Sequence, residues 1–373
     1  MPKIRVLVVD DSVVIRRLLT DELNKDPEIE VIGGAATGKI AVAKIPQVNP
    51  DIVTMDIEMP EMNGLEAVSE IRKTHAKLPI IMFSTLSQRA ARETLEALSR
   101  GANDYVTKPA NVGSAQLAMQ RVREELIPKI KGLCPDIAPT QPAATPSVTP
   151  KKEAASTYQL AKPRSGEAVE PIEIVAIGVS TGGPNALAEL IQALPTNLPV
   201  PIVIVQHMPP VFTKCLADRL TARGKTPVEE GAAGMVLKPG RAYLAPGDYH
   251  MVLNRRGPNV ELELNQDPPE NSCRPAVDVM FRSVAQVYGG RTLAVILTGM
   301  GQDGLRGCEV LREKNAQILA QDEASSVVWG MPGAVAQAGI ADTILPLNLI
   351  ANEIASRVQK AQAQQTKREP ALC

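Results

Sequence analysis

A proline-rich segment divides this 373-residue chain into two blocks that share one pattern. Between residues 133 and 171, seven prolines stand among Ala, Ser, Thr and Lys. Such a composition buries too little apolar surface to offset the entropy lost on ordering, which predicts an extended linker. We therefore expect domains at 1–125 and 172–361, joined by a helix end and linker at 126–171, and a flexible tail at 362–373. The 44% hydrophobic content suits two packed cores.

In both blocks, short apolar runs alternate with amphipathic segments, which is the pattern of parallel strands connected by helices. The first block has five strand-like runs: Ile4–Val9, Glu30–Ile32, Ile52–Met55, Ile80–Ser84 and Asp104–Thr107. They predict an α/β domain with one five-stranded parallel sheet and helices on both faces. The second block predicts a doubly wound, mainly parallel α/β domain, with Ala242–Leu264 as an antiparallel hairpin insertion.

Charge and hydropathy exclude several classes of protein. The net charge of −1 and the pI of about 6.4 argue against nucleic acid as a partner, which requires clustered Lys and Arg. No apolar run approaches the roughly 18–20 residues of a membrane helix, and the N-terminus lacks the pattern of a secretory signal. We therefore expect a cytoplasmic protein that is not inserted in a membrane. The five cysteines, none in C-x-x-C spacing, predict neither a disulfide framework nor a zinc site.

Polar residues stand at the ends of four predicted strands in the first block. They are Asp10 and Asp11 at the first strand, Asp56 at the third, Ser84 at the fourth and Lys108 at the fifth. Because the carboxyl ends of parallel strands meet at one edge of the sheet, we expect these side chains to converge. Three converging carboxylates repel one another, and a hard cation such as Mg²⁺ relieves this repulsion.

This group of residues suits phosphoryl transfer to a carboxylate. Mg²⁺ neutralises phosphate oxygens, Asp56 attacks as the nucleophile, and Lys108 and Ser84 receive the other oxygens. The alternative is that the acidic residues only cap helices or lie solvated in loops, which is the usual role of a single Asp after a strand. The match at successive strand ends favours the phosphoryl-transfer site.

The first block resembles the response-regulator receiver family over about 120 residues. The matching segments are VLVVDDS (6–12), MDIEMPEMNG (55–64), IIMFST (80–85) and DYVTKP (104–109). The resemblance implies a flavodoxin-like fold, a histidine kinase as the partner, and bound Mg²⁺ for phosphorylation. It also implies site roles: Asp56 as phosphoacceptor, Asp10, Asp11, Asp56 and the backbone carbonyl of Glu58 as metal ligands, and Ser84, Tyr105 and Lys108 as switch residues.

In the second block, a candidate nucleophile follows a buried strand. The segment Gly178-Val-Ser180-Thr-Gly182 lies between the apolar run EIVAIGV and a helical pattern. Glycines there permit a tight turn, and backbone N–H groups at the start of a helix can hold an oxyanion. The G-x-S-x-G pattern also occurs in glycine-rich loops that bind phosphate, so on its own it leaves both interpretations open.

A serine nucleophile needs a base and a carboxylate that orients the base. His207 directly follows the apolar run PIVIVQ, whereas His250 falls in the predicted hairpin and His75 in the first block. A strand-end His is the better base on geometry, and we interpret His250 as structural. Asp303 follows another buried run, TLAVILTG. Ser180, His207 and Asp303 are therefore expected at one edge of the second sheet.

Residues 172–360 resemble the catalytic domain of chemotaxis protein-glutamate methylesterases. The matching segments are AIGVSTGGP (176–184), IVIVQHMP (202–209), YLAPGDYHM (243–251) and LTGMGQDG (297–304). The resemblance implies Ser180 as nucleophile, His207 as general base and Asp303 as its orienting carboxylate. It also implies that Thr181 and the backbone of Met300 assist at the oxyanion site, and that the ester hydrolysis uses no cofactor.

The two resemblances together imply a phosphorylation-activated serine hydrolase. Its substrates would be glutamate methyl esters on methyl-accepting chemotaxis receptors, with release of methanol, and specific receptor glutamines, which it would deamidate during chemotaxis adaptation. The alternatives are a methylesterase of the same type in a non-chemotactic chemosensory pathway, or a catalytically silent response regulator that docks on receptors. A transcriptional regulator is disfavoured because the second block is not basic, and a dinucleotide-binding module because G-x-G-x-x-G is missing.

Overall fold

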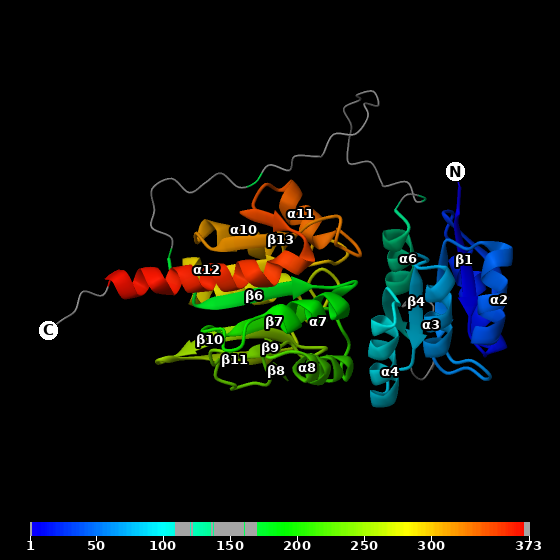
Figure 1. The fold of residues 1–373 in the computed structure, drawn as a ribbon, viewed down its shortest axis with the longest axis horizontal. Coiled ribbons are helices and arrows are strands. Elements are labelled where there is room, and N and C mark those ends of the chain that lie inside the picture. The colour runs from blue at the N-terminus through cyan, green and yellow to red at the C-terminus, as the bar shows by residue number, and fades with distance from the viewer. Residues whose placement is uncertain are drawn as a thin grey trace, which may run out of the picture. The chain divides into compact units, whose positions relative to one another are not determined.

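The computed structural model describes these residues of the chain: 2–108, 120, 122–135, 137, 160 and 170–368, with 361–368 as backbone alone. The chain divides into two compact units, residues 1–157 and 158–373, which are described separately (Figure 1). The division falls within the predicted linker at 126–171, most of which lies outside the described residues. Among the helices of the described ranges, none is both long enough and apolar enough to cross a membrane.

The first unit is built on a five-stranded parallel sheet in the order β2-β1-β3-β4-β5, as the sequence predicted. Its strands are β1 (Ile4–Val9), β2 (Ile29–Ala35), β3 (Ile52–Asp56), β4 (Ile80–Ser84) and β5 (Asp104–Thr107). The helical elements are α1 (Val13–Leu23), α2 (Gly38–Val48), α3 (Gly64–Thr74), α4 (Gln88–Ser99), the π-helical turn η1 (Val122–Leu126) and α6 (Ile127–Leu133). The second strand is longer at both ends than its apolar run indicated.

Both faces of this sheet are covered. Val6 and Leu7 are adjacent in β1 and therefore point to opposite faces, yet both are fully buried. One buried cluster joins the strands to α1, η1 and α6 through Leu19, Leu126 and Ile130. Helices α2, α3 and α4 form a second group of neighbours. The carboxyl edge of the sheet is thus left for the polar residues that follow the strands.

The second unit contains a seven-stranded sheet in the order β14-β13-β12-β6-β7-β9-β8, in which each pair of neighbours is parallel. The strands are β6 (Ile174–Val179), β7 (Ile202–Gln206), β8 (Val228–Glu230), β9 (Ala242–Leu244), β12 (Thr292–Ile296), β13 (Gln317–Gln321) and β14 (Thr343–Leu345). The hairpin strands are β10 (His250–Arg256) and β11 (Asn259–Asn265). The helices are α7 (Gly183–Ala193), α8 (Phe212–Arg223), α9 (Val277–Val287), the 3₁₀ turn η2 (Gly289–Arg291), α10 (Leu305–Glu313), α11 (Met331–Gln337) and α12 (Leu347–Arg368).

One sequence-based boundary of this unit was wrong. Ala242–Leu244, expected in the hairpin, instead forms β9 and pairs in parallel with β7 and β8 in the main sheet. Antiparallel pairing begins only where His250 faces Asn265. An apolar run alone does not reveal which strand it will pair with, because the pairing depends on distant parts of the chain. At the C-terminal end of the unit, the backbone of α12 continues as a helix to Arg368.

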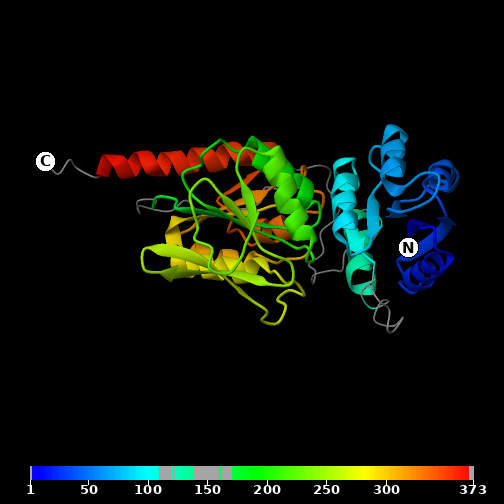
Figure 2. The ribbon, with the colours of Figure 1, turned by 90° about the horizontal axis from the view of Figure 1, so that it is seen from below.

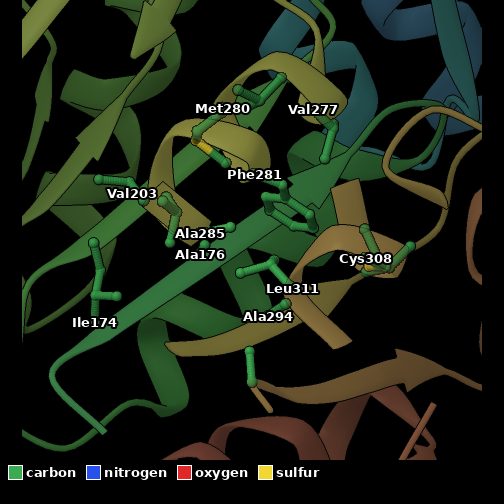
Figure 3. Close-up of a cluster of buried hydrophobic side chains, with 14 of the residues drawn as sticks. Ile174, Ala176, Val203, Val277, Met280, Phe281, Ala285, Ala294, Cys308 and Leu311 are labelled. Carbon is green, nitrogen blue, oxygen red and sulfur yellow. The ribbon is translucent and has the colours of Figure 1, made fainter. Parts of the chain in front are cut away.

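The core of the second unit fixes α9 against the sheet. Figure 3 shows Val277, Met280 and Phe281 of α9 in the buried cluster with Ala176 of β6 and Leu311 of α10. The same cluster continues into the hairpin β10–β11, whereas α7 has α8 and α12 as its neighbours. In Figure 2, α12 runs along one side of the unit and the hairpin lies on the other. Burial of the apolar face of α9 therefore fixes where its N-terminus meets the carboxyl edge of the sheet.

A close backbone approach in the first unit joins the end of β3 to the start of α3. The N–H of Gly64 donates to the carbonyl oxygen of Ile57 at 2.8 Å. A Cβ atom at Gly64 would lie 2.1 Å from the carbonyl oxygen of Asp56, so no side chain fits there. This contact holds the segment that carries Asp56.

We expect Gly64→Ala to lower the free energy of unfolding of the first unit by about 2 kcal/mol or more, because the opposing backbone cannot yield as a flexible side chain would. Gly34→Ala is the matched control, since a Cβ there meets its nearest neighbour at 3.5 Å. Urea denaturation followed by circular dichroism measures the loss. Fluorescence of the single tryptophan, Trp329, reports the second unit alone. Superimposable circular dichroism curves for the two alanine variants would contradict the steric argument.

Candidate active site and acidic pocket

Ser180 lies in the turn between β6 and α7. Gly182 in this turn has a φ of +77°, a conformation that residues with a side chain rarely adopt. Gly183 begins α7, and a Cβ there would lie 1.9 Å from Oε1 of Gln206. The backbone N–H of Ser180 donates to the carbonyl oxygen of Thr298, beyond the end of β12, at 3.1 Å. The glycines thus permit a tight turn that places Ser180 at the carboxyl edge of the sheet.

His207 lies at the end of the neighbouring strand. Strands β6 and β7 pair with Val179 opposite Gln206, so Ser180 and His207 are the next residues on each strand. The amide Nε2 of the buried Gln206 donates to the carbonyl oxygens of Ser180 at 2.9 Å and of His207 at 3.1 Å. One buried side chain therefore ties the two strand ends together.

Asp303 holds the imidazole of His207 by its Nε2 atom, at 2.7 Å from Oδ2. Because a carboxylate only accepts hydrogen bonds, Nε2 carries a proton, and in the neutral form of the ring Nδ1 is the nitrogen left to accept one. Burial alone lowers the pKa of His207, but its hydrogen bond to Asp303 and the negative charge of that carboxylate outweigh burial, with a further contribution from the contact with Cys273, and raise the pKa to about 10. The carboxylate of Asp303 thus stabilises the protonated imidazolium form of His207.

The carboxylate of Asp303 is buried and well supplied with donors. Besides Nε2 of His207, it accepts hydrogen bonds from the N–H groups of Val277 at 2.7 Å, Asp278 at 3.0 Å and Gly304 at 3.0 Å, and from Nδ2 of Asn271 at 2.8 Å. Val277 and Asp278 begin α9, and the first N–H groups of a helix lack partners inside it. Burial raises the pKa of Asp303, but His207 and these donors lower it below its ordinary value. Asp303 is therefore held as an anion.

The second ring nitrogen of His207 faces a thiol. Nδ1 lies 3.4 Å from Sγ of Cys273. Within the described part of the chain, the hydroxyl of Ser180 makes no hydrogen bond. The structure thus brings His207 and Asp303 into direct contact and places Ser180 at the adjacent strand end, without a hydrogen bond between Ser180 and His207.

Thr181 and Met300 lie in the two loops beside Ser180. The hydroxyl of Thr181 is buried and has no hydrogen-bond partner among the described residues. Met300 follows Gly299, where an added Cβ would lie 3.0 Å from Cβ of Ser180. Over the described ranges, the N–H of Met300 also makes no hydrogen bond. Two donors are therefore available next to Ser180.

The sequence motifs did not single out every residue around this site. The residues that contact the proposed triad without having been predicted include Gln206, Asn271, Cys273 and Asp278. Gln206 had a detectable signal, since it is an amide within a buried strand and directly precedes the candidate base. The other three come from residues 271–278, where the pattern predicted only the start of a helix. Their role depends on a fold that brings this segment to Asp303.

His250 is buried apart from the triad. Its Nδ1 accepts the N–H of Ala276 at 3.2 Å, and its Nε2 lies 3.2 Å from the carbonyl oxygen of Pro268. Both ring nitrogens are thus used by the backbone, in keeping with the structural interpretation.

In the first unit, Lys108 bridges two buried carboxylates. Its Nζ lies 2.8 Å from Oδ2 of Asp10 and 2.8 Å from Oδ1 of Asp56. Burial raises the pKa of Asp56 to about 6, although Lys108 opposes the shift. Burial lowers the pKa of Lys108, but its hydrogen bonds to the two carboxylates raise it overall. The single positive charge of Lys108 therefore neutralises the negative charge of the Asp10 and Asp56 carboxylates only in part.

The other predicted residues of the first unit surround this pocket. Ser84 ends β4 and is buried, and its Oγ accepts a hydrogen bond from Thr94 at 2.8 Å. The backbone N–H of Lys108 donates to the carbonyl oxygen of Ser84 at 2.5 Å. Tyr105 is buried in β5, with Nζ of Lys129 5.2 Å from the centre of its ring. Glu58 has an exposed side chain two residues after Asp56.

The acidic cluster suits a divalent cation. Asp10, Asp11 and Asp56 each offer one oxygen, and these oxygens lie within 4.8 Å of one another. Asp11 is exposed, whereas the other two are buried, so the cluster opens to solvent on one side. Mg²⁺ prefers a few carboxylates and retains several waters, which an open cluster of this kind allows.

Comparison with known proteins identifies both units. Residues 175–354 match the family described as CheB methylesterase, and residues 6–120 match the response regulator receiver domain. A protein of Trichodesmium erythraeum named protein-glutamate methylesterase/protein-glutamine glutaminase is 54% identical over 96% of this chain and 100% of its own length. A Nocardioides protein of the same name is 51% identical over 96% of this chain and 97% of its own. The crystal structure of the Thermotoga maritima CheB methylesterase catalytic domain is 43% identical, covers 50% of this chain and 98% of that domain, and has a TM-score of 0.49.

We expect His207 to stay protonated well above the ordinary imidazole range, with a titration midpoint nearer 10 than 6.5. Asp303→Asn should lower this midpoint because it removes the charge that stabilises the imidazolium. By linkage, the pair stabilises the fold fully below the unfolded pKa of histidine and loses this contribution as the pH rises through the folded pKa. Nuclear magnetic resonance of the three histidine rings, assigned by single substitutions, measures both midpoints. A wild-type midpoint at or below 6.5 would contradict the strong His207–Asp303 coupling.

Proposed function

The chain belongs to the family of CheB methylesterases that carry an N-terminal response-regulator receiver domain, and we propose that Ser180, His207 and Asp303 perform its chemistry. It is a protein-glutamate methylesterase and protein-glutamine glutaminase, which hydrolyses the methyl ester of glutamate side chains and the amide of glutamine side chains. The assignment of residues depends mainly on the 2.7 Å contact between His207 and Asp303, beside the turn that carries Ser180.

The proposed reaction has two acyl-transfer steps. The neutral form of His207, whose share grows as the pH rises toward its folded pKa, takes the hydroxyl proton at Nδ1 while Oγ of Ser180 attacks the ester carbonyl carbon, whose oxygen becomes an oxyanion. The oxyanion collapses, the bond to the methoxy group breaks, and methanol leaves with the proton from His207. Water then attacks the acyl-enzyme with His207 again as the base, which releases glutamate and restores Ser180. With glutamine as substrate, ammonia leaves in the first step.

The geometry supports these roles in three ways. The anionic Asp303 stabilises the imidazolium that forms in each step. The thiol of Cys273, 3.4 Å from Nδ1, is a weak hydrogen-bond donor that the hydroxyl of Ser180 can displace at the nitrogen lone pair. The N–H of Met300 and the hydroxyl of Thr181 supply donors for the oxyanion.

We further infer that the receiver domain accepts a phosphoryl group on Asp56. Oδ1 of Asp56 already binds Lys108 and accepts the N–H of Ile57 at 2.8 Å, so Oδ2 is the oxygen left for attack. Asp10, Asp11, Asp56 and the carbonyl of Glu58 would hold Mg²⁺, which neutralises phosphate oxygens when bound. Lys108 and Ser84 would contact the transferred phosphoryl group, with Tyr105 as the aromatic switch residue in β5.

The partners follow from the two domains. A receiver domain implies a phosphodonor, which we propose is a histidine kinase. A methylesterase of this family implies receptor substrates, which we propose are methyl-accepting chemotaxis receptors, so that the enzyme acts in chemotaxis adaptation. A catalytically silent docking role is not favoured, because the relatives over the whole chain are named as enzymes.

Ser180→Ala should reduce methanol release from methylated receptor membranes by about a thousandfold or more, because the nucleophile is lost. Ser356→Ala in α12 is the control, a serine-to-alanine change that leaves the site intact. Denaturation curves for both variants establish that each is folded. Activity of the Ser180 variant equal to that of the control would refute the proposed triad.

Methanol release should rise about fivefold or more when acetyl phosphate and Mg²⁺ are added, in the range typical of coupling between two sites. Asp56→Asn should abolish this response and keep the basal rate, since it removes the phosphoacceptor of the receiver domain and leaves the hydrolase residues in place. Asp21→Asn, an exposed aspartate in α1, is the control and should respond like the wild type. A full response in the Asp56 variant would show that phosphorylation occurs elsewhere, with the esterase assignment unaffected.

A further inference from the structure

Asn271 connects the proposed triad to a second buried carboxylate. Its Nδ2 donates to Oδ1 of Asp303 at 2.8 Å and to Oδ2 of Asp278 at 2.9 Å. An amide nitrogen carries two hydrogens, so each carboxylate receives one. Asn271 is itself exposed, but behind it Asp278 and Asp303 are only 1% and 2% exposed, so its amide takes the place of water at both carboxylates. Asn271 is thus the side chain that separates two buried negative groups.

The backbone holds Asn271 in an uncommon conformation for this purpose. Asn271 has a φ of 53° and Ser272 a φ of 61°, two consecutive residues in the left-handed region, which Asn tolerates better than most residues. Glu270 and Cys273 close the turn with two mutual backbone hydrogen bonds, of 3.1 and 2.9 Å. Nη1 of Arg282 in α9 donates to Oε1 of Glu270 at 2.7 Å and anchors the turn on that helix.

The same turn reaches both sides of the His207–Asp303 pair. Asn271 contacts the carboxylate, and Cys273, two residues later, contacts Nδ1 of the imidazole. A turn that only connected the hairpin to α9 would need neither contact. The conformation of this turn therefore places both side chains against the His207–Asp303 pair.

Electrostatics explains why a donor between the carboxylates matters. Burial and the charge of Asp303 raise the pKa of Asp278, whereas the N–H of Gly307, at 2.6 Å from its Oδ1, opposes the rise. Two carboxylates in one buried site resist ionising together unless donors satisfy both. Without Asn271, the two carboxylates of Asp278 and Asp303 would bind a shared proton more readily. Asp303 would then lose part of the negative charge that stabilises the His207 imidazolium.

We propose that Asn271 is a positioning residue of the hydrolase, which keeps Asp303 oriented and anionic for His207 by donating one N–H to Asp303 and the other to Asp278. This inference deepens the proposed function and rests on it for its kinetic consequences. Asn271 acts through Asp303 and contacts neither Ser180 nor His207 directly.

Asn271→Gly is the most informative variant, because glycine keeps the left-handed backbone and removes only the amide. It should lower kcat for methanol release by about ten- to a hundredfold, the usual effect of losing a hydrogen bond behind a primary site residue, with little change in KM. Asn254→Ala, which loses an exposed amide-to-carboxylate bond to Glu263 of 2.9 Å, is the matched control and should keep full activity.

Two further readouts separate positioning from a merely structural role. The His207 titration midpoint should fall by about one pH unit in Asn271→Gly, since less negative charge remains on Asp303, and the acid limb of kcat/KM should move to lower pH with it. Adding Asp278→Asn should recover part of the activity, because only one carboxylate then needs a donor. The other ionisable groups that face this site are unchanged in these variants: Glu270, Cys273, Arg282, Arg306 and Cys308.

Each outcome bears on the proposal. A kcat within twofold of the wild type, or a loss of activity with an unmoved His207 midpoint and no recovery in the double variant, would overturn it. If the wild type released no methanol, or Ser180→Ala retained activity, the proposed function would fail. The histidine titration of Asn271→Gly would then still decide whether Asn271 controls the charge of Asp303. Asn271→Asp, which adds a third carboxylate at the same place, should shift kcat further down than the glycine variant.

Discussion

The structure of the hydrolase unit depends on one buried carboxylate at the start of a helix. Helix α9 begins after Ala276, whose side chain cannot accept a hydrogen bond, so its first N–H groups need an acceptor from elsewhere. Asp303, from the loop after β12, accepts from Val277 and Asp278 and at the same time from His207. The carboxylate of Asp303 therefore accepts the free N–H groups at the start of α9 and also orients the imidazole of His207. Packing of α9 on the sheet through Met280 and Phe281 therefore also fixes the position of His207, the proposed base.

Both units bury carboxylates at the carboxyl edge of a parallel sheet, and they solve the resulting electrostatic problem differently. In the receiver domain, the charge of Lys108 is shared by Asp10 and Asp56, and Asp56 keeps a raised pKa of about 6. In the hydrolase, Asp303 is paired with the imidazole of His207 and with backbone N–H donors, and its pKa is lowered mainly by His207. An incompletely compensated carboxylate suits a site that is to receive a cation and a phosphoryl group. A fully satisfied anion suits a group that must stay charged through a reaction cycle.

The sequence predicted the two α/β architectures, and it pointed to the strand ends at which the candidate site residues lie, because both rest on short-range patterns. A buried strand followed by a polar residue can be recognised over about ten residues, and parallel topology brings such strand ends to one edge. Ala242–Leu244 was misassigned because short-range patterns do not show which strands will pair. This segment belongs to the main sheet through its pairing with β7 and β8. Likewise, the contact between Nδ1 of His207 and Cys273 involves residues far apart in the chain, and no local pattern indicated it.

Residue order alone was sufficient for the fold class, the family and the set of strand-end residues that includes Ser180, His207, Asp303 and Asp56. Only the folded chain decided which nitrogen of His207 meets Asp303, that the N-terminus of α9 supplies backbone donors to the same carboxylate, and that Asn271 lies between Asp303 and Asp278. The physical reason is that backbone N–H groups and a left-handed asparagine leave no distinctive residue pattern. Their effect arises when burial removes water and makes each buried charge depend on its few remaining donors.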